Sequence, residues 1–250
     1  MNLAIEAKKP IIIPTLAAAG RFGGFKPEIE RTVRDAEIKK DLKLEEIISA
    51  WKRNDIEFIT NIETRYEKTA GTVKGIVIDS SDIERFCIAL AGFQDEKEFG
   101  NKAGFFLSAL VNSCKNKDVI IRTSHLSERI NYLGFRNTKN VTIEGNAGES
   151  AGCQMKTGRI TLNGDALDNP GVWMRGGTLV VNGNAGEYAG WIMKAGRLII
   201  RGNAGSNVGG QMEGGLIRLE AGYASLSEAI TGGKIFHKGQ LIWPKGGGSE

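Results

Sequence analysis

The feature that most constrains this chain is a gapless repeat of nineteen residues that runs from residue 141 to residue 216. Its four rows are VTIEGNAGESAGCQMKTGR, ITLNGDALDNPGVWMRGGT, LVVNGNAGEYAGWIMKAGR and LIIRGNAGSNVGGQMEGGL, and a degraded fifth row begins at Ile217. A unit this short cannot bury an apolar face by itself and must stack on its neighbours. The repeat therefore predicts a solenoid.

Each row begins with a short strand and a corner. The first and third residues of every row are apolar and the residues after them are more often polar, which is typical of a strand with one buried face. A glycine follows each strand, where we expect a backbone geometry that residues with a Cβ resist. These structural glycines are Gly145, Gly164, Gly183 and Gly202.

Polar and apolar residues also recur in register after the corner. Short polar side chains that tolerate left-handed geometry and bond nearby backbone come first, and stacking would align them in a ladder. They are Asn146, Asp165, Asn184 and Asn203. Four methionines are expected to fill the interior, and they are Met155, Met174, Met193 and Met212. A second glycine turn precedes the next strand at residues 158, 177, 196 and 215.

The predicted fold class is mostly β, a short parallel β-helix of nineteen-residue coils with an amino-terminal α/β domain. The expected parts are an arm at 1–25, the α/β domain at 26–125, the β-helix with its caps at 126–243 and a disordered tail at 244–250. The degraded fifth row fits a terminal cap, and residues 125–140 offer apolar side chains to cover the other open end.

Within the amino-terminal domain we expect strands at 56–62, 73–79 and 119–121 and a helix over 103–115. Another helix starts near Ser81, because Ser81 and Glu84 have capping-box spacing. These elements together predict a small α/β unit.

Composition excludes several classes of function. The chain carries a net charge of +4, but the repeat holds six basic and six acidic side chains, so no nucleic-acid surface is indicated. Cys87, Cys114 and Cys153 are odd in number and widely spaced, which predicts reduced buried thiols. No apolar stretch approaches the roughly 20 residues that span a bilayer. We expect a cytoplasmic protein without membrane contact.

Candidate chemistry in the repeat is sparse. Glu149, Asp168 and Glu187 recur nineteen residues apart, and a hydrolase or lyase of the β-helix type would need such carboxylates to converge. The GNAG corner lacks a following Lys-Ser/Thr and a following helix, so it is not a phosphate-binding loop. His125 and His237 have no metal-ligand partner at useful spacing. We therefore expect no catalytic residue, bound cofactor or metal site on this chain.

A protein interface is the remaining candidate site. Trp173, Tyr188 and Trp191 lie in the less regular half of their rows, and together with Arg175 they are residue types favoured at interfaces. Core placement is the alternative for each aromatic. As a hypothesis, this face binds another protein.

The GNAGESAG, GNAGEYAG and GNAGSNVG rows, each followed by a Met and a glycine turn, closely resemble the GXGXG domain family. The regular period, and the GGKIFHKGQLIW ending at 232–243, look most like the GXGXG-repeat subunit of formylmethanofuran dehydrogenase. The resemblance covers about residues 131–243. Row two departs from the pattern at Leu167 and Pro170, and the first 125 residues match nothing in the family.

The resemblance implies a right-handed β-helix that assembles with catalytic subunits. In that family the molybdenum or tungsten pterin and the iron-sulfur clusters lie on other subunits, so the expected function is a non-catalytic scaffold of a multisubunit oxidoreductase in one-carbon metabolism. The alternatives are a stand-alone glutamate synthase domain, or the β-helix hydrolase or lyase named above. Expected partners are other protein subunits, and a homo-oligomer is also open.

Overall fold

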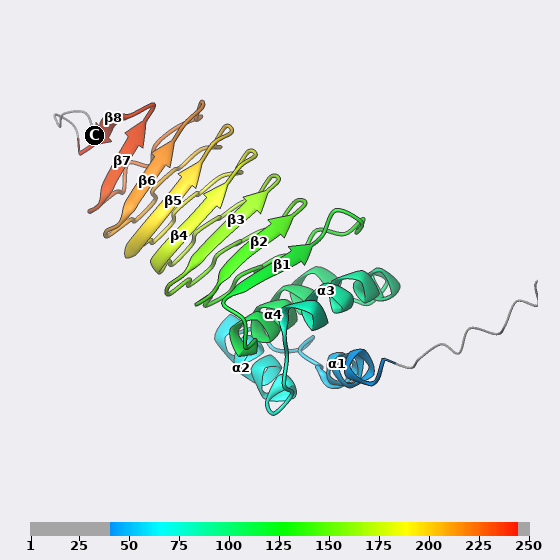
Figure 1. Ribbon diagram of the computed structural model, residues 1–250. Helices are drawn as coiled ribbons and strands as arrows, with labels where there is room; N and C mark the ends of the chain where they lie inside the picture. The colour runs from blue at the N-terminus through cyan, green and yellow to red at the C-terminus, as the bar shows by residue number, and fades with distance from the viewer. Residues whose placement is uncertain (1–40, 245–250) are drawn as a thin grey trace, which may run out of the picture. The chain divides into compact units, whose positions relative to one another are not determined.

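The computed structural model describes residues 41–244. The arm expected at 1–25, the start of the expected α/β domain and, apart from Pro244, the expected tail lie outside the described residues. The helices come first in the chain and the strands follow (Figure 1). The helices are α1 (Leu42–Arg53), α2 (Ile62–Val73), α3 (Ser80–Ala89), the 3-10 helix η1 (Leu90–Phe93) and α4 (Phe99–Ser113). The strands are β1 (Asp118–Arg122), β2 (Asn140–Glu144), β3 (Arg159–Asn163), β4 (Arg175–Val181), β5 (Ala195–Ile200), β6 (Leu216–Leu219), β7 (Lys234–His237) and β8 (Gln240–Trp243).

The strands form a parallel β-solenoid of about six turns, as the repeat predicts. They pair in chain order, with every neighbour parallel from β1 to β7 and only β8 antiparallel (Figure 1). The register follows the repeat, since Val141 pairs with Ile160 and Leu179 pairs with Leu198. The fold class is therefore confirmed for the repeat region.

One continuous core fills the coils. The first and third strand residues of all four rows are at most 3% exposed, and the four repeated methionines are fully buried. The same cluster continues without a break into the helical region, where Trp51 packs edge-on against Phe106 at 5.4 Å between ring centroids. The methionines are therefore core residues, as the sequence indicates.

The expected α/β domain is helical instead. The predicted strand at 56–62 is wrong, because Asn61 caps α2, accepting a hydrogen bond from Thr64 N at 3.0 Å, and the charged residues that follow form the exposed face of that helix. The predicted strand at 73–79 is also wrong, because Val73 ends α2 and the segment after it connects to Asp79, the cap of α3. Among the described residues before 125, the one strand is β1, and it pairs with β2 as the first strand of the solenoid.

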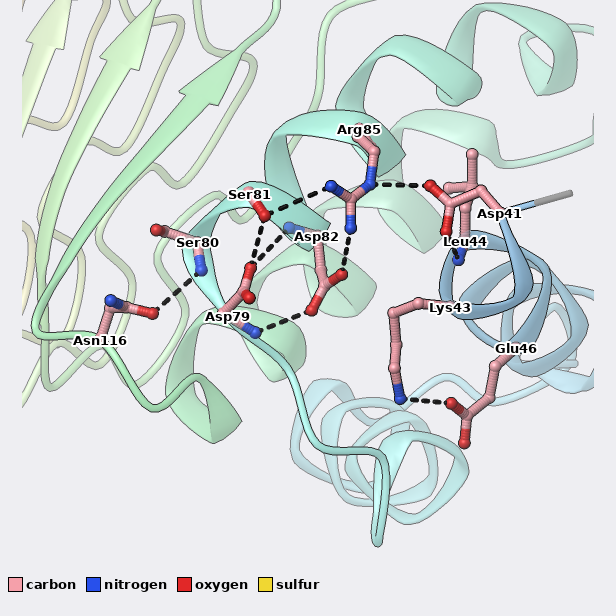
Figure 2. Close-up of polar contacts among 10 residues, drawn as sticks. All are labelled: Asp41, Lys43, Leu44, Glu46, Asp79, Ser80, Ser81, Asp82, Arg85 and Asn116. Atoms are coloured by element: carbon pink, nitrogen blue, oxygen red, sulfur yellow. Dashed lines mark hydrogen bonds and ion pairs between the residues drawn. The ribbon is translucent and has the colours of Figure 1, made fainter. Parts of the chain in front are cut away.

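The N-cap of helix α3 is Asp79, two residues before the predicted cap Ser81. Asp79 and Asp82 form its capping box, with Asp82 N donating to Asp79 Oδ1 at 3.0 Å and Asp79 N donating to Asp82 Oδ2 at 2.9 Å (Figure 2). The pKa of the Asp79 carboxyl is lowered, and the largest cause is the hydrogen bond that Ser81 donates to it. Arg85 then links Asp82 to Asp41, the cap of α1, so one guanidinium joins two helix starts.

Helix α4 covers the open end of the solenoid. A Cβ on Gly104 would lie 1.6 Å from Asn131 O, so glycine allows the helix to touch the chain there. Ser108 Oγ accepts hydrogen bonds from Gly134 N at 3.1 Å and Phe135 N at 3.0 Å. The segment expected to form the cap, 125–140, is instead the loop half of the first coil. The cap is formed by α4 on this loop and by α3, which contacts β1.

Candidate functional site

The corner glycines are required by contact between coils. Gly145 lies in the left-handed region at a φ of 123°, but Gly164, Gly183 and Gly202 do not. A Cβ at those three positions would lie 2.3 to 2.6 Å from the carbonyl oxygen of the corner glycine one coil earlier. The expected reason, an unusual backbone geometry, is therefore wrong for three of the four corners.

The polar ladder beside the corners forms as predicted. Asn146 Oδ1 accepts from Asp165 N at 2.9 Å, Asp165 Oδ1 accepts from Asn184 N at 2.7 Å, and Asn184 Oδ1 accepts from Asn203 N at 2.9 Å. Each side chain thus satisfies a backbone N–H of the next coil that the strand pairing leaves free. These residues keep negative φ angles, so the role of the side chain as an acceptor explains them.

The loop half of each coil carries two columns of non-glycine residues in left-handed conformation, and the sequence interpretation missed both. The first column is Tyr132, Ser150, Asn169, Tyr188 and Asn207, and the second is Arg136, Gln154, Trp173, Ile192 and Gln211. A left-handed isoleucine or tryptophan is a rare conformation. The available signal was the repeated glycine between the columns, since each column stands two residues from it.

A second apolar cluster joins the helical region to the outside of the loops. Phe135, Cys153 and Val172 stack in consecutive coils and point away from the main core, and Ile56 and Phe105 of the helical region bury them. Trp173 and Trp191 pack at the edge of this cluster. Two of the four predicted interface residues therefore take part in a contact within the chain.

Arg136 links α2 to the loops beside this second apolar cluster. Its guanidinium lies 3.5 Å from Glu63 and 3.4 Å from Glu67 on α2, and its Nε donates to Gln154 Oε1 at 3.1 Å. Gln154 in turn donates to Glu63 Oε1 at 3.1 Å. The start of α2 is thus tied to the loop face by a partly buried polar network.

A cleft of about 390 Å³ remains between the start of α2 and the loop face. Its lining residues are Asn61, Ile62, Glu63, Gln154, Trp173, Arg175, Ile192 and Lys194. Lys194 pairs with Glu213 at 3.4 Å, whereas Arg175 has no ion pair within the described part of the chain. Trp173 and Arg175 therefore meet in one cleft whose lining combines apolar side chains with the charges of Arg175, Lys194 and Glu63.

Beyond the cleft, apolar side chains gather on the two middle coils. Tyr188 and Leu167 are each 39% exposed, and Tyr188 packs on Trp191 with ring centroids 6.1 Å apart. In repeat rows one and four the matching positions of the left-handed columns are polar, and Tyr132 in the coil before them stacks on Phe105 of α4. Exposed apolar groups on a rigid loop surface are features of protein-binding sites.

The acidic residues Glu149, Asp168 and Glu187 stand in one column without forming a reactive cluster. Glu149 and Glu187 are exposed, and Asp168 Oδ1 accepts the backbone N–H of Glu187 at 2.8 Å. Within residues 41–244, no group of three or more His, Cys, Asp or Glu side chains is placed to hold a metal ion. His125 and His237 contact the carbonyl oxygens of Cys87 and Ala221.

The three cysteines are free and buried, as predicted. Burial raises the pKa of the Cys87 thiol to about 11 and raises that of Cys153 further. Both thiols therefore stay protonated at neutral pH, which disfavours nucleophilic chemistry.

In the described residues, no helix is both long enough and apolar enough to cross a membrane. Comparison of the chain with family models, with curated proteins and with solved structures finds no match in any of the three.

Proposed function

We propose that this chain is a non-catalytic assembly subunit of a cytoplasmic multisubunit oxidoreductase, and that the loop face of its solenoid binds a partner subunit. The molybdenum or tungsten pterin and iron-sulfur clusters of such a complex would lie on the partners. The resemblance of the GNAG rows to the GXGXG-repeat subunit of formylmethanofuran dehydrogenase supports the choice of enzyme class.

One observation carries the proposal, namely the change of polarity along the two left-handed columns. Along the four repeat rows the second column reads Gln154, Trp173, Ile192 and Gln211, and Arg136 precedes them in the first coil. The first column places Tyr188 in the third coil, between Asn169 and Asn207. The interior of the solenoid repeats regardless of these positions. Trp173 packs on the second apolar cluster, but contacts within the chain do not account for Tyr188, which is 39% exposed.

The docking surface consists of Leu167, Tyr188 and Trp191, with Trp173 and Arg175 at its edge. Aromatic anchors with a nearby arginine supply much of the binding free energy in many interfaces. The backbone beneath them is held by hydrogen bonds between coils, such as Tyr188 N to Ser206 O at 2.9 Å. Such a surface loses little conformational entropy on binding.

The test is affinity purification of the tagged chain from its native host, followed by identification of the attached proteins. Tyr188→Ala combined with Leu167→Ala should remove the partner, while the matched variant Gln211→Ala, in the same left-handed columns, should retain it. Both variants should keep the thermal unfolding of the wild type, because these side chains lie outside the core. Retention of the partner by the double variant would refute the assigned surface.

The identity of the attached proteins separates the two related hypotheses. Metalloenzyme subunits with pterin and iron-sulfur centres would support the formylmethanofuran dehydrogenase class. Glutamate synthase subunits would support the stand-alone domain instead. A chain that purifies without any partner would contradict both.

A further inference from the structure

The turn between α1 and α2 presents a single exposed aromatic ring. Ile56 on this turn is 3% exposed and Ile59 packs on the same apolar cluster, but Phe58 between them is 85% exposed. It is the most exposed of the large apolar side chains in the described residues. The ring contacts Lys97, whose Nζ lies 5.9 Å from its centroid.

Phe58 is exposed although hydrogen bonds hold the backbone around it. Ile59 N donates to Ile56 O at 3.1 Å, which closes the turn. Arg65 donates to the carbonyl oxygens on both sides of Phe58, those of Ile59 and Glu57, and its Nη1 pairs with Glu98 at 2.6 Å. The Arg65 side chain is only 12% exposed. The backbone on both sides of Phe58 is therefore held by a largely buried guanidinium.

The same chain carries a cavity suited to such a ring. The cleft of about 390 Å³ described above has Ile62, Trp173 and Ile192 on its walls and Arg175 and Lys194 at its rim. A phenyl ring would pack on the indole and the two isoleucines. Ile59, the residue after Phe58, packs against the same apolar cluster as Ile62 and Trp173 of the cleft wall, which places the turn that carries the ring beside the cleft.

We propose that two copies of this chain associate about a twofold axis, with Phe58 of each copy inserted in the cleft of the other. Because ring and cleft are adjacent, one axis beside the turn brings both pairs together at once, as an isologous contact requires. One charge pair favours this arrangement, although Glu63 also lines the cleft. Glu57 Oε1 pairs with Lys97, which leaves Oε2 for Arg175, the rim cation that has no ion pair among the described residues.

This contact shares Trp173 and Arg175 with the edge of the docking surface proposed above, but it does not use Tyr188 or Leu167. The Tyr188→Ala, Leu167→Ala variant should therefore remain a dimer, which separates the two proposals. Sedimentation equilibrium of the purified full chain should give a mass twice the 27.0 kDa of one chain at micromolar concentrations. Phe58→Asp should weaken dimerisation at least about tenfold, as expected for loss of a central aromatic anchor. The matched control is Ile88→Asp on α3, a residue that is 65% exposed, and it should leave the dimer unchanged.

A complementation test removes the ambiguity of a single variant. Phe58→Asp retains its cleft, whereas Ile192→Arg blocks the cleft and retains the ring. Each variant alone should be monomeric, and their mixture should form a heterodimer through one remaining ring and cleft. Circular dichroism of each variant establishes that it is folded.

A photoreactive phenylalanine analogue at position 58 gives a second measurement. In a mixture of isotopically light and heavy chains, it should cross-link to the segment around 173–192 of the other isotope. A monomeric wild type, a dimer that persists in Phe58→Asp, or cross-links confined to one isotope would each overturn the proposal. Capture of the enzyme partner by a monomeric wild type would leave the proposed function standing.

Discussion

Gly202→Ala tests whether contact between coils makes glycine necessary at the corners. Gly202 has no left-handed φ, yet a Cβ there would lie 2.5 Å from Gly183 O and 2.7 Å from Asn184 Oδ1. Gly202 N also donates to Gly183 O at 3.0 Å, so the two coils are tied at the point of the clash. The new methyl group can be accommodated only if the coils move apart.

Adding a methyl group to a well-packed interior typically costs about 1–3 kcal/mol. The nearest atoms belong to backbone that strand pairing holds on both sides, so we expect the upper end, about 3 kcal/mol, for Gly202→Ala. In a domain of this size 1 kcal/mol shifts Tm by roughly 2–4 °C, which gives a decrease of roughly 6–12 °C.

Two other glycines separate the contributions of contact and of backbone conformation. Gly75 has a φ of 89°, and a Cβ added there would meet nothing within 4 Å, so Gly75→Ala should cost only the left-handed conformation, about 1–2 kcal/mol. Gly92 has neither constraint, and Gly92→Ala should stay within about 0.5 kcal/mol of the wild type.

Urea unfolding followed by circular dichroism and tryptophan fluorescence measures all three variants against the wild type. The expected order of destabilisation is Gly202→Ala, then Gly75→Ala, then Gly92→Ala. If Gly202→Ala were no less stable than Gly92→Ala, contact between coils would not explain the repeated corner glycine.

Three further predictions follow from burial and charge. Met193→Ala should lower the free energy of unfolding by about 2–5 kcal/mol in urea titrations, because Met193 is fully buried and its loss leaves a cavity; a change below that of an exposed-site variant would contradict the packing. Cys87 and Cys153 should not react with Ellman's reagent at pH 8 until the protein unfolds, because burial raises both pKa values; rapid labelling of the native chain would contradict this. The hydrogen bond from Arg65 lowers the pKa of Glu98, so its stabilising contribution is present above the pKa of an unfolded glutamate and is lost as pH falls through the lower folded value. Glu98→Gln should therefore reduce the loss of stability on acidification, and an unchanged pH profile would contradict the linkage.

The repeat predicts the solenoid well because its constraint is local and recurs in every coil. Every coil contains a strand with two inward residues, a corner glycine and an acceptor side chain. Each of these features has the same role in every coil, so together they specify the whole nineteen-residue unit. The first and last coils escape this pattern, since Val119 pairs with Val141 at a spacing of 22 and Ile217 pairs with Ile235 at a spacing of 18. A search for a fixed period therefore misses both ends.

The helical region was harder to predict because its apolar residues are placed to pack on distant parts of the chain and do not follow the period of a local helix or strand. The segment 56–62 was predicted as a strand, but its Ile56, Ile59 and Ile62 lie on a turn and at a helix start that pack on the outward residues of the coils. Nothing local in the sequence indicates that Cys153 and Val172 point outward to receive them. The cleft beside Trp173 was unpredictable for the same reason, since it arises where α2 meets the loops.

The left-handed columns also bear on how such a protein can change over time. Their positions hold serine, asparagine, tyrosine, glutamine, tryptophan and isoleucine in the same backbone conformation. The conformation is set by the stacked coils, so the identity of these side chains is open to selection by whatever binds them. Adjacent rows lie about 4.8 Å apart. In-frame gain or loss of one nineteen-residue unit would thus move the surface side chains that a partner recognises by one row. The packing of the interior would stay the same, because it repeats in every row.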